Sequence, residues 1–189
     1  MPTDHPIIFP PWRISDWETV DDRIRGGKSV STLQEHDDGV WFRGMLDIIA
    51  LGGAGFASQR FCFTNEPLHL PRPEYQGIRV KLSSQSNDLH NPREFTLVLN
   101  TEPITHRPDG RVNSRVTWEA TFADSAPSWD LSFNVFRATY RGRPVDPAPV
   151  FDPSIVYDLS LMCRSAFGKQ CGPFELHILS IEAILKPKY

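Results

Sequence analysis

The sequence predicts an all-β protein, a jelly-roll-like antiparallel β-sandwich that forms a single domain over residues 1–189. The main observation is a series of short runs in which apolar and polar residues alternate with period two, as in strands with one buried face. The second is the set of 17 prolines and 12 glycines, which mostly separate these runs and thereby mark turns. No segment shows the pattern of a long amphipathic helix, although residues 16–24 could form a short helical turn.

We expect the strands in the following order along the chain. Residues 30–48 predict two strands joined by a polar turn, and a further strand follows the glycine-rich residues 52–58. Alternation then predicts strands over 77–83, 93–100, 115–122, 128–136, 156–165 and 172–181. About eight to ten strands, each with one apolar face, require two sheets packed face to face.

The stretch DDRIRGGKS, residues 21–29, superficially resembles the end of a phosphate-binding loop. That loop requires a glycine five residues before Gly27 and a helix behind it, whereas Asp22 stands at that position and a strand follows. Residues 52–58 likewise lack the third glycine of a dinucleotide-binding fingerprint, because Ser58 replaces it. We therefore expect Gly26 and Gly27 to serve a turn that needs a positive φ or brings the chain close to a neighbouring strand.

Composition and charge exclude several classes of protein. A formal net charge of −3 gives no general attraction to nucleic acid, and no apolar run is long enough for a membrane span. The N-terminus has no signal-peptide core and is too acidic for a mitochondrial transit helix, so the sequence predicts a cytoplasmic protein. The three cysteines, an odd and sparse set, are expected to be buried thiols in a reducing compartment.

The polar faces of the strands hold the candidate site. We expect one sheet to present a shared set of polar residues, namely Ser58, Arg60, Arg79, Lys81, Arg115, Thr117, Glu119, Glu175 and His177. Hydroxyls and charges there would fix a polar ligand while a tryptophan stacks on it. The predicted ligand contacts are Arg60, Arg115, Thr117, Trp118 and Glu175. In an enzyme, Glu119 and His177 would transfer protons, because a carboxylate beside an imidazole titrates near neutral pH. The alternative is an ordinary solvated sheet face.

Residue spacing predicts neither a metal site nor a cofactor site. The six histidines, at positions 5, 36, 69, 90, 106 and 177, show no spacing typical of zinc ligands. Asp21, Asp22 and Glu175 could supply oxygen ligands to a structural calcium ion. The simpler interpretation is that Asp22 caps a turn and Glu175 lies on a polar face.

A set of residues at the start of the chain follows the pattern W-x(3)-D-D-x(3)-G-G-x-S, namely Trp17, Asp21, Asp22, Gly26, Gly27 and Ser29. This pattern resembles the N-terminal signature of the complex I intermediate-associated protein 30 family. Further segments resemble the family in the same order, namely Phe42-x-Gly44, residues 55–60, Tyr75-x-Gly77-Ile78, the aromatic positions of 118–136, Arg141-Gly142 and residues 172–183. The resemblance covers residues 12–185, after a short N-terminal arm, and implies a galactose-binding-domain-like β-sandwich.

The resemblance implies a binding or assembly protein, because the namesake members bind partner proteins during assembly of respiratory complex I. It also implies a mitochondrial location as the alternative to the cytoplasm, and it supplies no catalytic residues. The alternative function is a cofactor-independent enzyme, a cyclase or isomerase that acts on a small biosynthetic intermediate in the sandwich cleft. The fold alone suggests a third function, a carbohydrate-binding module. The expected partner is a protein or a small-molecule ligand, and the expected state is a monomer or a homodimer.

Overall fold

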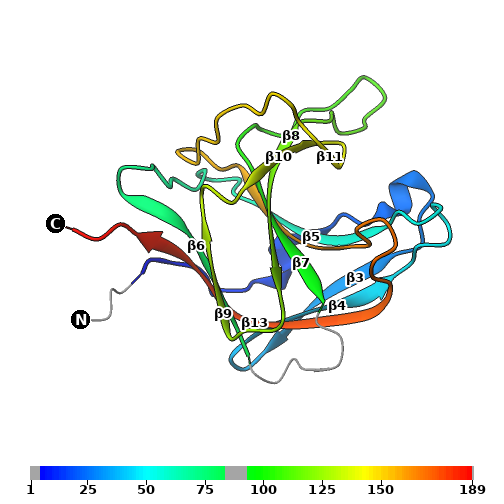
Figure 1. The fold of residues 1–189 in the computed structure, drawn as a ribbon, viewed down its shortest axis with the longest axis horizontal. Coiled ribbons are helices and arrows are strands. Elements are labelled where there is room, and N and C mark those ends of the chain that lie inside the picture. Colours follow the sequence, from blue (N-terminus) through cyan, green and yellow to red (C-terminus); the bar gives the residue numbers. More distant parts are fainter. Residues whose placement is uncertain (1–4, 84–92, 189) are drawn as a thin grey trace.

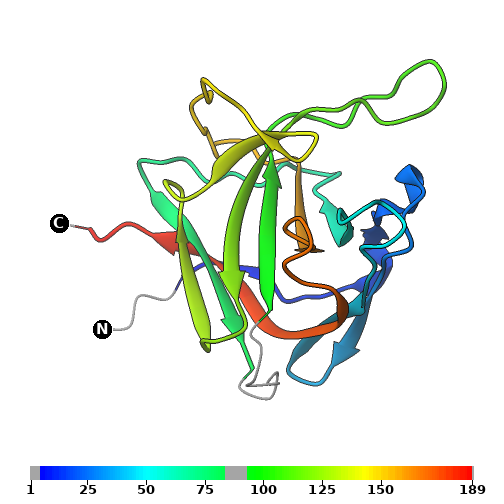
Figure 2. The ribbon, with the colours of Figure 1, turned by 45° about the vertical axis from the view of Figure 1, so that its right-hand side comes forward.

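The computed structural model describes residues 5–83 and 93–188. In these residues, two antiparallel sheets pack face to face over one hydrophobic core, which confirms the predicted β-sandwich (Figure 1 and Figure 2). The elements in chain order are β1 (Ile7–Phe9), η1 (Ile14–Asp16), β2 (Trp17–Thr19), η2 (Asp22–Arg25), β3 (Val30–His36), β4 (Gly39–Leu46), β5 (Phe56–Cys62), β6 (Tyr75–Leu82), β7 (Glu94–Asn100), β8 (Val116–Ala123), β9 (Ser128–Ser132), β10 (Arg137–Tyr140), β11 (Arg143–Pro144), β12 (Asp158–Arg164) and β13 (Gly172–Leu185).

The first sheet is six-stranded in the described residues, with the order β3-β4-β13-β6-β9 and with β1 paired to β13. Its longest strand is β13, which pairs with β4 as far as Ile178 and with β6 from there onward. The register shifts between Ile178 and Ser180, where β13 passes from one neighbour to the other. Phe174, Leu176 and Ile178 point into the core, so the residues between them point outward.

The second sheet is seven-stranded in the same part of the chain, with the order β11-β10-β8-β7-β12-β5-β2. Leu97 of β7 lies opposite Ala120 of β8 on one side and Leu161 of β12 on the other, and all three are buried in the core. Because side chains alternate along a strand, Val98, Glu119 and Ser160 form the corresponding row on the outer face.

The structure differs from the predicted strand over 128–136. Strand β9 ends at Ser132, and β10 begins at Arg137 in the other sheet, so the chain crosses between the sheets at this point. Phe133 remains buried, but Val135, which the alternation of the predicted strand would place on the same face, is 46% exposed. Strands β1, β2, β10 and β11 were not predicted, because two to four residues are too few to show alternation.

Candidate binding site

The carboxylate of Asp22 is an internal anchor of the N-terminal motif. It is fully buried and accepts hydrogen bonds from the N–H and the hydroxyl of Ser29, at 3.0 and 2.8 Å, and from the N–H of Phe56 at 3.1 Å. Its neighbour Asp21 is also buried and accepts from the N–H and the hydroxyl of Ser31, at 3.0 and 2.7 Å, and from the N–H of Ser58 at 2.9 Å. The pair therefore ties the first sheet, through β3, to the second, through β5.

Gly26 and Gly27 of the motif each require glycine, but for different structural reasons. Gly26 ends η2 in the left-handed region at a φ of 83°, as a turn glycine should. At Gly27, a Cβ atom would lie 2.2 Å from Cγ of Asp22. The close neighbour of Gly27 is therefore the buried carboxylate of its own loop, and the predicted approach to a neighbouring strand is wrong.

The calcium interpretation finds no support in this geometry. The groups around Asp21 and Asp22 are N–H and O–H donors, which occupy the oxygens that a cation would need. Glu175 lies instead on the outer face of the six-stranded sheet, where Arg43 is 3.2 Å away.

The outer face of the seven-stranded sheet carries a layer of polar side chains that are buried although they point away from the core. Seven of them are less than 9% exposed, namely Ser58, Thr96, Asn100, Glu119, Thr139, Asp158 and Ser160. Buried polar groups are stable only when they are paired. The two buried carboxylates of this layer have partners on neighbouring strands, Asn100 and Thr139, and each also pairs with an arginine, Arg115 or Arg164.

Glu119 is the centre of one group in this layer. Its Oε1 accepts a hydrogen bond from Thr139 Oγ1 at 2.8 Å, and its Oε2 lies 2.6 Å from Arg164 Nη1. Thr117 shares the same corner, with its hydroxyl 2.8 Å from that of Thr139. Both oxygens of Glu119 therefore have partners inside the sheet.

Asp158 is the centre of a second group. It is 1% exposed, accepts a hydrogen bond from Asn100 at 2.6 Å, and forms an ion pair with Arg115. Arg115 also donates to the carbonyl oxygen of Glu102. The ion pair therefore fastens both ends of the segment 101–115 to the sheet.

Arg60 forms a third pair on this face, with Glu18 of β2 at 2.7 Å. Burial opposes the charge of Arg60, but the hydrogen bond and the charge of Glu18 outweigh burial, so the pKa of Arg60 is raised. Three predicted ligand contacts, Arg60, Arg115 and Thr117, thus lie together with Glu119 on one face. Each of them is engaged by a neighbour within the protein.

The remaining predicted residues lie elsewhere. Trp118 is in the core, stacked on Phe151 with 4.7 Å between ring centroids, so a ligand on the outer face would not reach its ring. Glu175 and His177 lie on β13, on the outer face of the six-stranded sheet, together with Arg79 and Lys81 of β6. The expectation that one sheet presents all nine polar residues is therefore wrong, because alternation fixes the face of a strand but not its sheet.

The predicted proton-transfer pair is not formed. Glu119 and His177 belong to different sheets and point to opposite outer faces, with the core between them. The ring of His177 is buried and stacks on Trp41, with 4.3 Å between centroids. Burial lowers the pKa of His177 and outweighs the opposing charge of Asp38.

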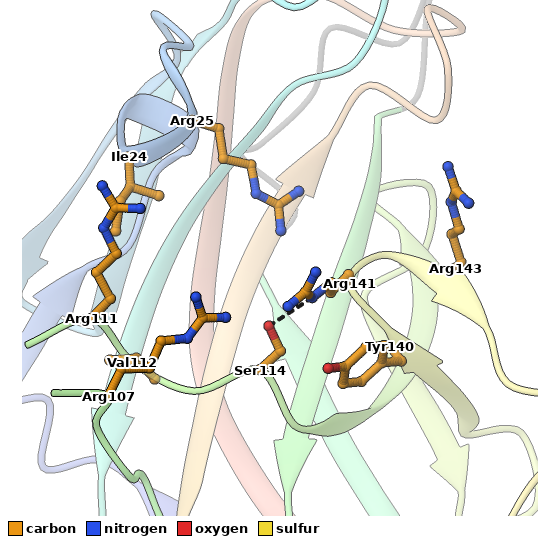
Figure 3. A pocket seen from close by; sticks show the side chains of 9 residues that line it. All are labelled: Ile24, Arg25, Arg107, Arg111, Val112, Ser114, Tyr140, Arg141 and Arg143. Carbon is orange, nitrogen blue, oxygen red and sulfur yellow. Dashed lines mark hydrogen bonds between the residues drawn. The ribbon is translucent and has the colours of Figure 1, made fainter. Parts of the chain in front are cut away.

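A pocket of about 760 Å³ opens beside the seven-stranded sheet, and arginines dominate its lining (Figure 3). Three segments meet there, namely η2, the hairpin within 101–115 and the β10–β11 hairpin. The lining residues are Ile24, Arg25, Arg107, Arg111, Val112, Ser114, Tyr140, Arg141 and Arg143. We call this feature the arginine pocket.

Turn chemistry places the arginines around the pocket. Arg141 and Gly142 both have positive φ, 53° and 76°, which is the signature of a type I′ hairpin turn between β10 and β11. The side chain of Arg141 points toward Ser114 and donates from Nε to Ser114 Oγ at 2.9 Å (Figure 3). Arg107 and Arg111 face each other across their hairpin, where the N–H of Arg107 donates to the carbonyl of Arg111 at 2.8 Å.

The charge of the arginine pocket is nearly uncompensated. No carboxylate lines it in the part of the chain that the structure describes. Of its five arginines, only Arg111 has an acidic partner there, Asp109 at 4.0 Å. Arg25 and Arg141 lie over aromatic rings, those of Phe56 and Tyr140, at 5.6 and 5.4 Å from the ring centroids. Five like charges in one hollow create a positive local field, although the net charge of the chain is −3.

Sequence reasoning missed the arginine pocket, because its arginines come from segments that we interpreted only as turns. A usable signal was present: the segments 21–29, 101–113 and 141–154 each carry arginine beside glycine or proline. No periodic pattern shows that three such loops meet.

The protein is an antiparallel β-sandwich, and the arginine pocket opens beside its seven-stranded sheet. Residues 10–178 match the family Complex I intermediate-associated protein 30 (CIA30), and the chain belongs to this family. It is similar to an uncharacterised protein of Schizosaccharomyces pombe, with 34% identity over 183 residues, 93% of this chain and 80% of the relative.

Two solved structures of similar fold are carbohydrate-binding modules. One is the family 11 module of a cellulosomal cellulase of Clostridium thermocellum, with a TM-score of 0.60 and 11% identity over 98% of this chain and 96% of that one. Another is the family 11 module from the same organism in complex with a β-1,3-1,4-mixed-linked tetrasaccharide, with a TM-score of 0.62 and 11% identity over 98% of both chains. At this identity the likeness shows the fold alone. Within the described residues, no helix has the length and apolar character needed to span a membrane.

Proposed function

We propose that this chain is a binding protein that holds an acidic segment of a protein partner in the arginine pocket. The observation that carries the proposal is the set of five arginines around one hollow, with no carboxylate among the described residues that line it. Guanidinium groups present several N–H donors in a plane and match carboxylate oxygens in pairs. An extended acidic segment could therefore engage several of them at once.

The surroundings of the pocket support binding. The ion pairs of Asp158 with Arg115 and of Glu119 with Arg164 hold the sheet beside the pocket in a fixed arrangement. Two of the three pocket walls are hairpins and the third is the helical turn η2, so much of the pocket's shape exists before a partner arrives, which lowers the entropy lost on binding. The family description, an intermediate-associated protein, fits a protein partner.

The two other predicted functions receive less support. The enzyme hypothesis depended on Glu119 acting with His177, and the structure places them on opposite faces. Carbohydrate platforms stack sugars on exposed aromatic rings. None of the five tryptophans is exposed, and four of them are buried. The exposed ring in the pocket, Tyr140, has the guanidinium of Arg141 over it.

Fluorescence anisotropy of purified protein tests the proposal, with a labelled ten-residue polyglutamate peptide as the probe. We expect saturable binding that weakens as salt rises, because screening at about 0.15 M already acts within about 8 Å. The double variant Arg107→Ala/Arg141→Ala should weaken binding about tenfold, since exposed ion pairs contribute up to about 1 kcal/mol each. Arg13→Ala, an exposed arginine outside the pocket, is the matched control.

Two results would contradict the proposal. One is equal binding of polyglutamate by the wild type and by the double variant, which would mean that the acidic probe binds elsewhere. The other is no binding of polyglutamate together with saturable binding of a mixed-linked glucan tetrasaccharide, which would favour the carbohydrate function.

A further inference from the structure

A second cluster of polar groups lies on the opposite side of the molecule, on the outer face of the six-stranded sheet. His36 ends β3, Asp38 belongs to the turn that leads into β4, and His177 lies in β13, the next strand of the sheet. One possible ligand atom from each of the three residues lies within 4.8 Å of the other two. This cluster shares no residue with the arginine pocket.

The oxygen Oδ1 of Asp38 joins the two imidazoles. It is 2.7 Å from His36 Nδ1 and 3.1 Å from His177 Nε2. The two rings are nearly perpendicular, at 78°, with 4.9 Å between their centroids. The β3–β4 turn thus brings the carboxylate of Asp38 and the imidazole of His36 close to the imidazole of His177 in β13.

His177 supplies an independent observation. Its side chain is 1% exposed, its Nδ1 has no hydrogen-bond partner among the described residues, and its Nε2 has only the 3.1 Å contact with Asp38 Oδ1. A buried imidazole with so few partners is uncommon, because nearly all buried polar groups are hydrogen-bonded. The face of the His177 ring stacks on Trp41. The indole of Trp41 is in turn contacted by the guanidinium of Arg43, 4.2 Å from the indole centroid. The ring is therefore fixed in place with one nitrogen directed at Asp38.

We propose that His36, Asp38 and His177 form a binding site for a divalent transition-metal ion, with Zn²⁺ as the principal candidate. Two imidazole nitrogens and one carboxylate oxygen suit zinc and its neighbours in the first transition series. Calcium and magnesium prefer sets of oxygen ligands and do not fit. Three protein ligands leave a fourth position of the tetrahedron for water or for an external ligand.

The geometry needs little adjustment to accept the ion. Zinc–ligand bonds of about 2.0–2.2 Å place the ligand atoms about 3.3 Å apart. His36 and Asp38 are 46% and 56% exposed, so their side chains are free to move the remaining distance toward the fixed ring of His177. A bound ion would join the tip of the β3–β4 hairpin to β13.

Calorimetric titration of the untagged, metal-stripped chain with ZnCl₂ tests the site. We expect one Zn²⁺ per chain, unaffected by a large excess of Mg²⁺ or Ca²⁺. Thermal unfolding should shift upward by about 5–10 °C when free Zn²⁺ is a hundredfold above Kd. Co²⁺ should give the visible absorption of a bound ion, a readout of the ligand geometry itself.

Variants at the exposed ligands keep the test independent of folding. His36→Ala and Asp38→Asn should each weaken Zn²⁺ at least tenfold, whereas Asp37→Asn in the same turn and His106→Ala in another hairpin should not. Circular dichroism checks that each variant is folded. The proposal is overturned if the wild type shows no saturable site, or if His36→Ala and Asp38→Asn bind Zn²⁺ as tightly as the wild type does.

Discussion

Replacement of Asp22 by alanine should strongly destabilise the protein. The fully buried carboxylate accepts two hydrogen bonds from Ser29 and one from Phe56. Each buried donor left without a partner costs about 1–3 kcal/mol. Since water can enter the space that the carboxylate leaves, we expect a total loss of about 3–5 kcal/mol in the free energy of unfolding, at the lower end of the sum for three donors.

Equilibrium unfolding in urea, followed by tryptophan fluorescence, measures this loss. With an m-value of about 2–3 kcal/mol/M, the midpoint for Asp22→Ala should fall by about 1.5 M relative to the wild type. Glu66→Ala, which removes an exposed carboxylate, should change the free energy of unfolding by less than about 0.5 kcal/mol. A loss for Asp22→Ala as small as that of the control would refute the structural role that we assign to the motif.

Three further outcomes follow from the geometry. Gly27→Ala should destabilise more than Gly26→Ala, as measured by thermal unfolding, because a Cβ at Gly27 meets a buried carboxylate whereas Gly26 has open space and pays only for its positive φ; equal effects would contradict this. Burial raises the pKa of Cys163 to about 12, so a thiol reagent at pH 8 should label the exposed Cys171 and leave Cys163 unmodified until the chain unfolds; mass spectrometry of the labelled chain shows which occurred. The hydrogen bond from Arg79, whose Nε lies 2.6 Å from Asp130 Oδ1, lowers the pKa of Asp130 below its usual value. The stabilising contribution of Asp130 is therefore present above about pH 4 and is lost as the pH falls through the lowered pKa; Asp130→Asn should flatten the stability profile at that acidic end, and an unchanged profile would contradict the assignment.

Much of the fold could be predicted from the sequence, because alternation reports local geometry. The run Val116, Trp118, Ala120 and Phe122 predicted both a strand and its buried face, and β8 shows both. The short strands could not be found in this way. The chain leaves one sheet for the other after Ser132 while keeping Phe133 buried, so hydrophobicity alone continued the predicted strand too far.

The candidate sites depended on information that alternation lacks. The pattern at Glu119 and at His177 says that each points outward, but only long-range pairing decides that they belong to different sheets. The same pairing brings His177 beside His36 and Asp38, which are far away in the sequence and show no ligand spacing. The histidine at position 90 lies outside the described residues.

The most direct test of the arginine pocket is recovery of partners from native cells. Affinity purification of the tagged chain, read by mass spectrometry, would compare the wild type, Arg13→Ala and the double variant Arg107→Ala/Arg141→Ala. We expect a stoichiometric protein partner with the first two chains, released by raised salt and lost from the double variant. Recovery of the same partner by the double variant, or a wild-type chain recovered without any partner, would contradict it.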